Sequence, residues 1–369
     1  MKRLSLITTL LFASLCVIAQ PSITSVSPLT GIPGSTVTIT GTGFNTTPAN
    51  DVVYFGATRA TVSAASATSL TVTVPTGATY DYVTVNNTAF GLTAYSGMPF
   101  LPTYNNTGFV PGTENFNPGI LFQDTANTNE GRAIVDIDGD GKLDVVLLKA
   151  HNALAIYRNT SSGGSVSFAS PVYFTTGHNP SSIAIGDLDG DGKPDISIGD
   201  LDDNEVSVFR NTSTVGSITL GARVAFSCVG FGNPLSIAIA DIDGDGRPEI
   251  VVGSPEPLHT IQLFRNTSSP GSITTGSFAG VVTYAATRQL MDIVVSDIDG
   301  DGKPDICYTS VDSATVSVMR NTSSVGMINS GTLATAVNFS VGNHPFARDL
   351  QLHSQMPLPV ALGVLRQQV

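Results

Sequence analysis

One nine-residue acidic pattern, repeated four times, limits most strongly what this chain can fold into. The pattern has Asp at its first, third and fifth positions, Gly at its sixth and an acidic residue at its ninth. Its copies begin at Asp136, Asp187, Asp241 and Asp297, so successive copies lie 51, 54 and 56 residues apart. A strand-like run precedes and follows each copy. This regular period indicates one structural unit per repeat.

Each repeat contains four strand-like segments of alternating polarity. The first and second flank the acidic pattern, the third ends in a recurring "RNTS", and a fourth such as "SPVYFTTG" follows. Four strands in about fifty residues predict one blade of a β-propeller, because the rungs of a β-helix are much shorter. The Asn-Thr-Ser triplets match the glycosylation sequon, but their recurrence at one position of the repeat is explained by a turn.

The acidic pattern has the ligand layout of an oxygen-binding cation site. Carboxylates at positions 1, 3, 5 and 9 and a backbone carbonyl at position 7 would surround the ion, and Gly at position 6 permits the sharp turn. Many anionic oxygens favour Ca²⁺ over Mg²⁺, and the lack of nitrogen and sulfur donors disfavours zinc and copper. The predicted metal ligands are Asp136, Asp138, Asp140, Lys142, Asp144, Asp187, Asp189, Asp191, Lys193, Asp195, Asp241, Asp243, Asp245, Arg247, Glu249, Asp297, Asp299, Asp301, Lys303 and Asp305.

Two other interpretations of the acidic pattern are weaker. An EF-hand needs a bidentate Glu at position 12 and flanking helices, whereas this chain has apolar or aromatic residues there and strand-like flanks. A solvated hairpin would explain one copy. It explains four copies poorly, because four like charges in one turn repel one another unless a cation or protonation offsets them.

The chain preceding the repeats divides into three further segments. Residues 1–20 have two basic residues and then an apolar run too short for a comfortable membrane span, which predicts a secretory signal peptide. Residues 21–100 carry short alternating runs such as "STVTITGTGF" and "SLTVTVPT", typical of a β-sandwich. This segment resembles an IPT/TIG immunoglobulin-like domain, which implies a spacer or interaction module. Residues 101–131 are predicted to be a connector with a possible closing strand at 119–123.

The recurring "DLDGDGKPD" between strands resembles the FG-GAP/VCBS repeats, which are related to the calcium-binding propeller of integrin α chains. The resemblance covers roughly residues 115–345 and implies one Ca²⁺ loop per blade. We predict an all-β fold: an immunoglobulin-like β-sandwich followed by a β-propeller of four recognisable blades at 132–345. The family's propellers have about seven blades, and the acidic pattern is absent where a fifth copy would begin, at Leu352. We therefore expect an incomplete ring and an aberrant tail at 346–369.

Composition narrows the possible functions. A net charge of −12 argues against a nucleic-acid partner. No apolar run of membrane length follows the predicted signal peptide, so we expect a secreted or cell-surface protein without a membrane span. The two remaining cysteines, Cys228 and Cys307, lie in strand-like runs and are expected to be buried thiols.

We predict a non-enzymatic adhesion or binding protein with an extracellular protein or glycan ligand. The absence of Trp favours a protein over a glycan. The alternatives are a component of extracellular polysaccharide processing and a pure surface spacer. For an enzyme, the best side-chain cluster is in loops expected on the opposite rim from the acidic pattern, and it comprises Asp200, Asp202, Asp203, Glu205, Glu256 and His259.

Overall fold

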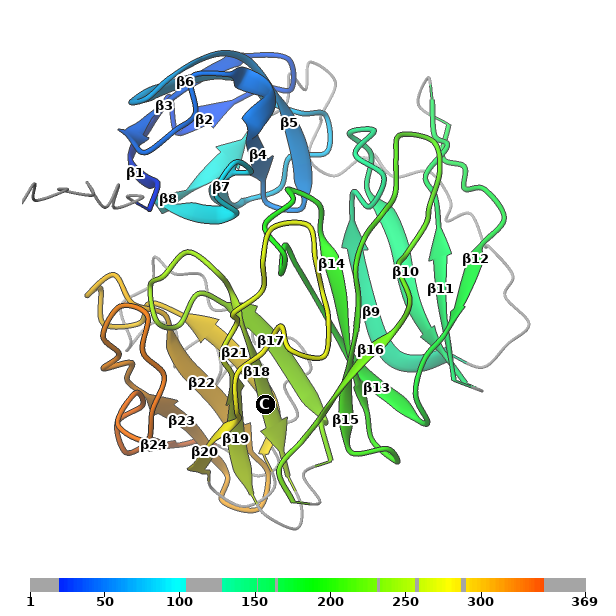
Figure 1. The fold of residues 1–369 in the computed structure, drawn as a ribbon, viewed down its shortest axis with the longest axis vertical. Helices are drawn as coiled ribbons and strands as arrows, with labels where there is room; N and C mark the ends of the chain where they lie inside the picture. Colours follow the sequence, from blue (N-terminus) through cyan, green and yellow to red (C-terminus); the bar gives the residue numbers. More distant parts are fainter. Residues whose placement is uncertain are drawn as a thin grey trace, which may run out of the picture.

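The computed structural model describes residues 20–103, 128–150, 152–162, 165–230, 233–255, 259–286 and 290–341. Within these ranges the chain forms 24 β-strands and one short 3₁₀ helix, Pro48–Asn50, which confirms the all-β class. The predicted signal peptide, the possible strand at 119–123 and the tail at 346–369 lie outside the described residues. The described strands form two parts, an N-terminal sandwich and a series of blades (Figure 1).

The N-terminal part is an immunoglobulin-like sandwich whose two layers share one strand. Its strands are β1 (Ser22–Ser27), β2 (Thr30–Gly31), β3 (Thr36–Thr42), β4 (Asp51–Phe55), β5 (Thr58–Ser66), β6 (Ser69–Thr73), β7 (Asp81–Asn87) and β8 (Leu92–Pro102). The sheet order is β1-β3-β6-β5-β4-β7-β8-β2. The start of β5 pairs with β4 and the rest pairs with β6, with an irregularity between Val62 and Ala64. This irregularity lets one strand pass from one layer to the other.

Alternating side chains fill the core between the two layers. In β3, Val37 and Ile39 are fully buried while their neighbours in sequence are exposed, as period-two patterning requires. Phe55 and Phe100 pack edge to face at the centre, with ring centroids 4.8 Å apart. The strands predicted from "STVTITGTGF" and "SLTVTVPT" are therefore confirmed as β3 and β6.

The propeller contains four blades within the described residues, each a four-stranded antiparallel sheet with its strands in chain order. Blade 1 has β9 (Thr128–Val135), β10 (Asp144–Lys149), β11 (Ala153–Tyr157) and β12 (Val172–Thr175); blade 2 has β13 (Pro180–Gly186), β14 (Asp195–Asp200), β15 (Glu205–Phe209) and β16 (Val224–Ser227). Blade 3 has β17 (Ser236–Ala240), β18 (Glu249–Ser254), β19 (Thr260–Phe264) and β20 (Val282–Ala285); blade 4 has β21 (Leu290–Ser296), β22 (Asp305–Ser310), β23 (Thr315–Met319) and β24 (Val337–Ser340).

Successive blades are held together by apolar faces. In blade 2, Ile196 and Ile198 face blade 1 and share a buried cluster with Val146 and Leu148. Equivalent clusters join blade 2 to blade 3 and blade 3 to blade 4. Because side chains alternate along each strand, a central strand can contribute to the clusters on both sides of its blade.

The two remaining cysteines are both free and buried, as predicted. Burial raises the pKa of each thiol, Cys228 and Cys307, to about 12. They therefore act as small apolar side chains in the propeller.

Candidate metal centres

Each acidic pattern forms the loop between the first and second strands of its blade. We call these loops 1 (136–144), 2 (187–195), 3 (241–249) and 4 (297–305). In loop 2, Gly190 and Gly192 have φ angles of +68° and +82°, and the equivalent glycines of the other loops have similar values. Residues with a Cβ rarely adopt this conformation, so glycine at positions 4 and 6 permits the tight turn that gathers the carboxylates.

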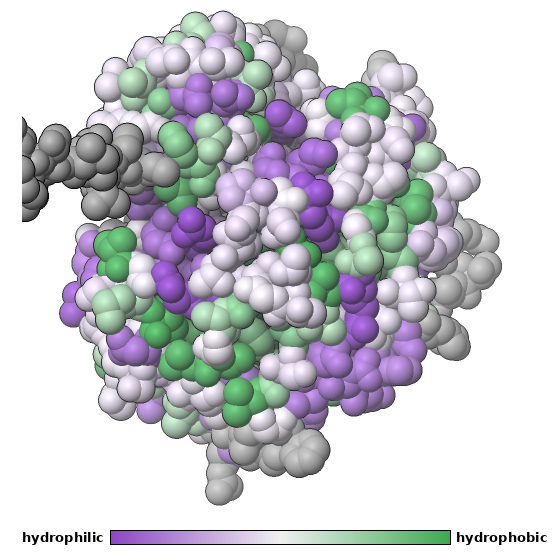
Figure 2. Space-filling model, viewed as in Figure 1, coloured by the Kyte–Doolittle hydropathy of each residue, from purple (hydrophilic) through white to green (hydrophobic). Residues whose placement is uncertain are grey.

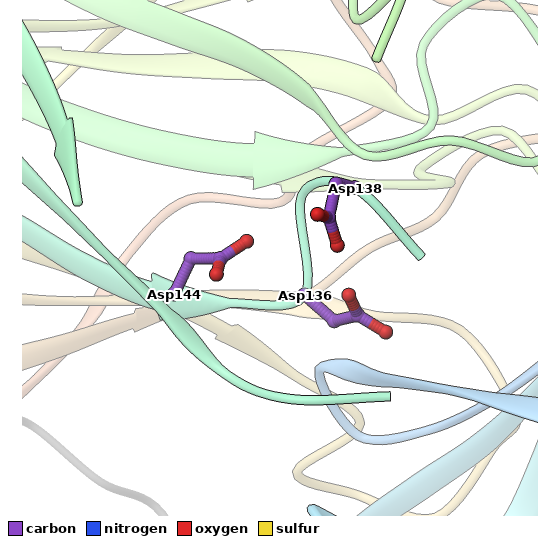
Figure 3. A group of neighbouring side chains, drawn as sticks. All are labelled: Asp136, Asp138 and Asp144. Carbon is purple, nitrogen blue, oxygen red and sulfur yellow. The ribbon is translucent and has the colours of Figure 1, made fainter. Parts of the chain in front are cut away.

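Three carboxylates in each loop converge on one point. Oxygen atoms from positions 1, 3 and 9 lie within 4.8 Å of one another in all four loops. Figure 3 shows loop 1, in which Asp136 and Asp138 on the turn and Asp144 at the start of β10 surround a shared space. The converging residues are Asp136, Asp138, Asp144, Asp187, Asp189, Asp195, Asp241, Asp243, Glu249, Asp297, Asp299 and Asp305. An all-oxygen donor set of this kind fits a hard divalent cation.

The carboxylate at position 9 also anchors the loop to its blade. In blade 1, Asp144 accepts the backbone N–H of Ile137 at 3.0 Å and that of Asn159 at 2.7 Å. The same two bonds recur in the other blades, where Asp195, Glu249 and Asp305 are the acceptors. Position 9 thus joins the acidic loop to the turn that follows the third strand.

The carboxylates at position 5 are not among the three that lie within 4.8 Å of one another, and they contact cationic side chains. In loop 3, Asp245 pairs with the guanidinium of Arg265, whose Nη2 is 3.1 Å from Oδ2, while Arg265 Nε is 2.7 Å from Asp243. Arg210 and Arg320 make the same two-carboxylate contact in blades 2 and 4. In loop 1, Asp140 lies 3.4 Å from Lys142 Nζ. The predicted position-5 ligands Asp140, Asp191, Asp245 and Asp301 therefore stay a prediction, since the structure places only positions 1, 3 and 9 in the close group.

Side chains at position 7 are likewise directed elsewhere. Lys193 and Lys303 donate to the carbonyls of Ser213 and Ser323, at 2.9 and 2.7 Å, in the turns after their third strands. Arg247 lies 3.4 Å from Asp245. These contacts are compatible with the prediction that position 7 would offer only its backbone carbonyl. In loops 2 to 4 the two cationic side chains offset half of the four formal carboxylate charges. The two negative charges that remain would be neutralised by one divalent cation.

Arg210, Arg265 and Arg320 belong to the recurring "RNTS", from which the sequence predicts an anchor of each arginine within its own blade or a ligand-lining position. The contact with two carboxylates of the acidic loop is the part that this prediction does not include. A signal of this contact was present in the sequence, because each Arg follows the position-5 Asp of its own blade by 19 or 20 residues. That spacing does not by itself show that the guanidinium reaches back across two strands.

Burial in the loops raises the free energy of the ionised carboxylates and therefore raises their pKa values. Burial, and then repulsion from carboxylates of the same loop, raises the pKa of Asp187 to about 8 and that of Glu249 to about 9. Burial raises the pKa of Asp241 to about 7 and that of Asp136 and Asp144 to about 6. Backbone N–H donors within each loop oppose this effect only in part.

The Asn of three of the four "RNTS" segments links its blade to the acidic loop of the preceding blade. Asn266, fully buried in blade 3, donates from Nδ2 to the carbonyl of Leu188 in loop 2 at 2.8 Å. Asn211 and Asn321 make the equivalent bonds to Ile137 and Ile242 at 2.9 and 2.8 Å. In three of the four triplets the Asn and Ser are therefore buried in a structural turn, which agrees with the turn interpretation.

The rim opposite the acidic loops holds most of the side chains considered for an enzyme. Asp203 accepts the backbone N–H of His178 at 2.7 Å and lies 2.8 Å from its Nδ1. Glu205 pairs with Arg223 at 2.8 Å, and Asp202 accepts from Asn179. Glu256 lies outside the described residues. These carboxylates are engaged in contacts that order their loops.

Asp200 on this rim predicts a pH dependence of stability. Its side chain is fully buried, and burial raises its pKa to about 6, against a smaller lowering by the hydroxyl of Ser207 and by Arg223. In the unfolded chain the carboxyl ionises near pH 3.9. The folded state therefore holds a proton that the unfolded state has lost, and stability from this group is full below pH 4 and is lost as pH rises through 6.

We expect Asp200→Asn to remove this pH dependence. The difference in unfolding free energy between variant and wild type should change by roughly 2 kcal/mol from pH 4 to pH 7, in favour of the variant at neutral pH. Urea unfolding of both proteins at several pH values measures this free-energy difference. The acidic loops titrate in both proteins, so their contribution cancels when one free energy is subtracted from the other. Asp202→Asn, at an exposed neighbour, is the control. A pH-independent difference would contradict the prediction.

Among the described residues there is no helix long and apolar enough to span a membrane. Comparison with curated proteins finds no match. Among solved structures, an auxiliary nutrient binding protein from Bacteroides ovatus is 14% identical over 89% of this chain and 92% of its own, with a TM-score of 0.31. A catalytically inactive virginiamycin B lyase from Staphylococcus aureus is 12% identical over 91% and 86%, with a TM-score of 0.34. Neither likeness is close enough to indicate a function.

Family models match two parts of the chain. The model of the IPT/TIG domain matches residues 21–100, which are the N-terminal sandwich. The model of the FG-GAP-like repeat matches residues 136–198 and 196–252, which contain loops 1 to 3. Loop 4 has the same convergence of positions 1, 3 and 9 as the matched loops. This chain is therefore an FG-GAP-repeat β-propeller protein with an N-terminal IPT/TIG domain.

Proposed function

We propose that this chain is a secreted or cell-surface binding protein, not an enzyme, whose propeller binds one Ca²⁺ in each acidic loop. The observation that carries the proposal is the convergence of three carboxylates in all four loops. The donor set consists of hard oxygens, and in loops 2 to 4 the formal negative charge left after the cationic neighbours is what one divalent cation would neutralise. When bound, Ca²⁺ would supply the positive charge that these buried carboxylates lack.

The residues of the chain then act as follows. The carboxylates at positions 1, 3 and 9 would hold the ion, with position 7 offering its carbonyl. The arginine after the third strand orients positions 3 and 5. The result would be a rigid set of blades whose other loops present a surface to an extracellular protein or glycan. The absence of Trp in this chain favours a protein ligand, because sugar-binding sites commonly stack sugars on exposed aromatic side chains.

The first test counts the bound ions. Isothermal titration with CaCl₂ should give about four Ca²⁺ per chain, at the dissociation constants of roughly 10⁻⁴–10⁻³ M typical of extracellular modules. The double variant Asp241→Asn/Asp243→Asn should lose one site, while the matched change Asp202→Asn on the opposite rim should lose none. No binding at millimolar Ca²⁺ would overturn the proposal.

The second test separates the ligand classes. A glycan array and purified candidate surface proteins are probed in Ca²⁺ and in chelator, with the same loop variant as control. Ca²⁺-dependent binding to glycans would support a lectin-like function, and binding to a surface protein would support adhesion. Turnover of a polysaccharide by the purified chain would contradict a non-enzymatic function.

A further inference from the structure

The N-terminal domain presents a second apolar face, separate from its core, to the propeller. In β4, Val53 and Phe55 belong to the core of the domain, so their neighbours Val52 and Tyr54 point the other way. Val52 is nevertheless only 4% exposed, and its side chain lies at Gly192 of loop 2. The Tyr54 hydroxyl donates to the carbonyl of Gly192 at 2.9 Å. The propeller therefore buries this face.

The same domain reaches loops 1 and 3 by backbone hydrogen bonds. The N–H of Asp136, the first residue of loop 1, donates to the carbonyl of Ala57 at 3.2 Å. The N–H of Thr93 donates to the carbonyl of Gly246 in loop 3 at 2.9 Å, and Leu92 packs on that glycine. Figure 1 shows the domain standing over the ends of the blades, and Figure 2 shows hydrophilic surface along this junction.

The backbones of the two domains touch at loop 2. A Cβ placed on Gly190 would lie 2.4 Å from the Cα of Gly91 in the turn between β7 and β8. Only glycine at position 190 permits this approach, and a Cβ on Gly91 would itself lie 2.7 Å from Pro270 Cγ. The backbones of the loop and the domain are therefore in direct contact at these two residues.

The next blade in the series also contacts each of these loops, through the hairpin after its third strand. Gly216 donates its backbone N–H to Asp138 Oδ2 in loop 1 at 2.8 Å. Gly271 and Gly326 donate theirs to the carbonyls of Asp189 in loop 2 and Asp243 in loop 3, both at 3.0 Å. Loops 1, 2 and 3 are thus each contacted by the N-terminal domain and by a hairpin of the next blade, most closely at loop 2.

Loop 4 is open by comparison. The Asp299 side chain is 36% exposed, whereas its equivalents Asp189 and Asp243 are fully buried. Among the described residues, no atom lies within 4 Å of a Cβ placed on Gly300 or Gly302, whereas Gly192 and Gly246 of loops 2 and 3 meet Val52 and Leu92 of the N-terminal domain. Loop 1 is intermediate, because Gly141 also has open space beside it although Asp136 donates to Ala57. The four loops share one sequence pattern but have different surroundings.

We propose that the N-terminal domain is the outer wall of cation sites 1 to 3, so that cation binding and domain docking stabilise each other, while loop 4 is an independent, freely exchanging site. The inference rests on the proposed binding of Ca²⁺. Docking removes water from clustered carboxylates, which is costly unless a cation compensates. If a bound cation raises the equilibrium constant for domain docking by some factor, docking must raise the affinity for the cation by the same factor.

The experiment combines titration with hydrogen exchange on the full chain. Thr93 N–H donates across the junction, so its exchange reports docking. We expect two classes of Ca²⁺ site in the wild type, three tighter and one weaker, and slower exchange at Thr93 in Ca²⁺ than in chelator. Val52→Arg should weaken the three tighter sites by roughly ten-fold, a typical coupling, leave the weaker site unchanged and speed exchange at Thr93.

Two further variants keep the result interpretable. Thr38→Arg, on an exposed position of β3 in the same domain, should change neither readout. If Val52→Arg does not fold, Tyr54→Phe removes only the hydroxyl and should weaken one tighter site by roughly three-fold. Four equivalent sites with no effect of these variants would overturn this inference and leave Ca²⁺ binding intact. No Ca²⁺ binding in the wild type would overturn both.

Discussion

The midpoint of thermal unfolding of this chain should rise by roughly 10–20 °C when chelator is replaced by Ca²⁺ at about ten times its dissociation constant. Each occupied site adds about 1.4 kcal/mol to the unfolding free energy at that concentration, because only the folded state gathers the three carboxylates. Four sites in a propeller of this size give the stated range.

The size of the effect depends on the loops and not on ionic strength. Mg²⁺ at the same concentration is the control, since its small octahedral shell fits a loop of many carboxylates poorly. The variant Asp241→Asn/Asp243→Asn should reduce the rise by about a quarter. An unchanged midpoint with a folded baseline would mean that the acidic loops are solvated turns.

The second large effect is expected from Asn266→Ala, at the link between blades 2 and 3. Asn266 donates to the carbonyls of Leu188 and Pro248 at 2.8 and 2.9 Å, and its Oδ1 accepts the N–H of Ser268. The side chain is fully buried, so the alanine variant leaves buried polar groups without a partner. We expect the unfolding free energy to fall by roughly 3 kcal/mol.

Urea unfolding in chelator measures this loss without a contribution from cations. Thr267→Ala, in the same turn but exposed, is the matched control and should cost less than about 1 kcal/mol. Asn266→Asp should be at least as harmful as the alanine variant, because it removes the two donated bonds and adds a charge beside Glu249. If Asn266→Ala unfolds at the wild-type urea concentration, the link between blades does not contribute to stability.

The two predictions test different parts of one junction. Loop 2 receives hydrogen bonds from its own blade, from blade 3 and from the N-terminal domain. A cation held in the loop would therefore stabilise three packed units together. A single uncharged turn would suffice to join two strands of a blade. Stabilisation of several packed units by one cation accounts for the presence of an acidic loop at each junction between described blades.

The sequence by itself determined the blades, the position of the acidic loops and the chemistry of their donors. These features are local: strands such as 195–200 follow from alternation and from the period of the repeat, and the turn follows from glycine at position 6. The convergence of positions 1, 3 and 9 could be predicted because all three lie within nine residues.

Only the tertiary structure decided which carboxylates pair with arginines and which loops contact the N-terminal domain. Asp191 pairs with Arg210, 19 residues away across two strands, and loop 2 is contacted by Tyr54, 138 residues from Gly192. Four copies of one pattern consequently have different surroundings: the N-terminal domain contacts loops 1 to 3, and Asp299 in loop 4 is more exposed than its equivalents. The physical reason is that desolvation and ion pairing depend on which distant surfaces pack against a loop, and a local pattern carries no record of that packing.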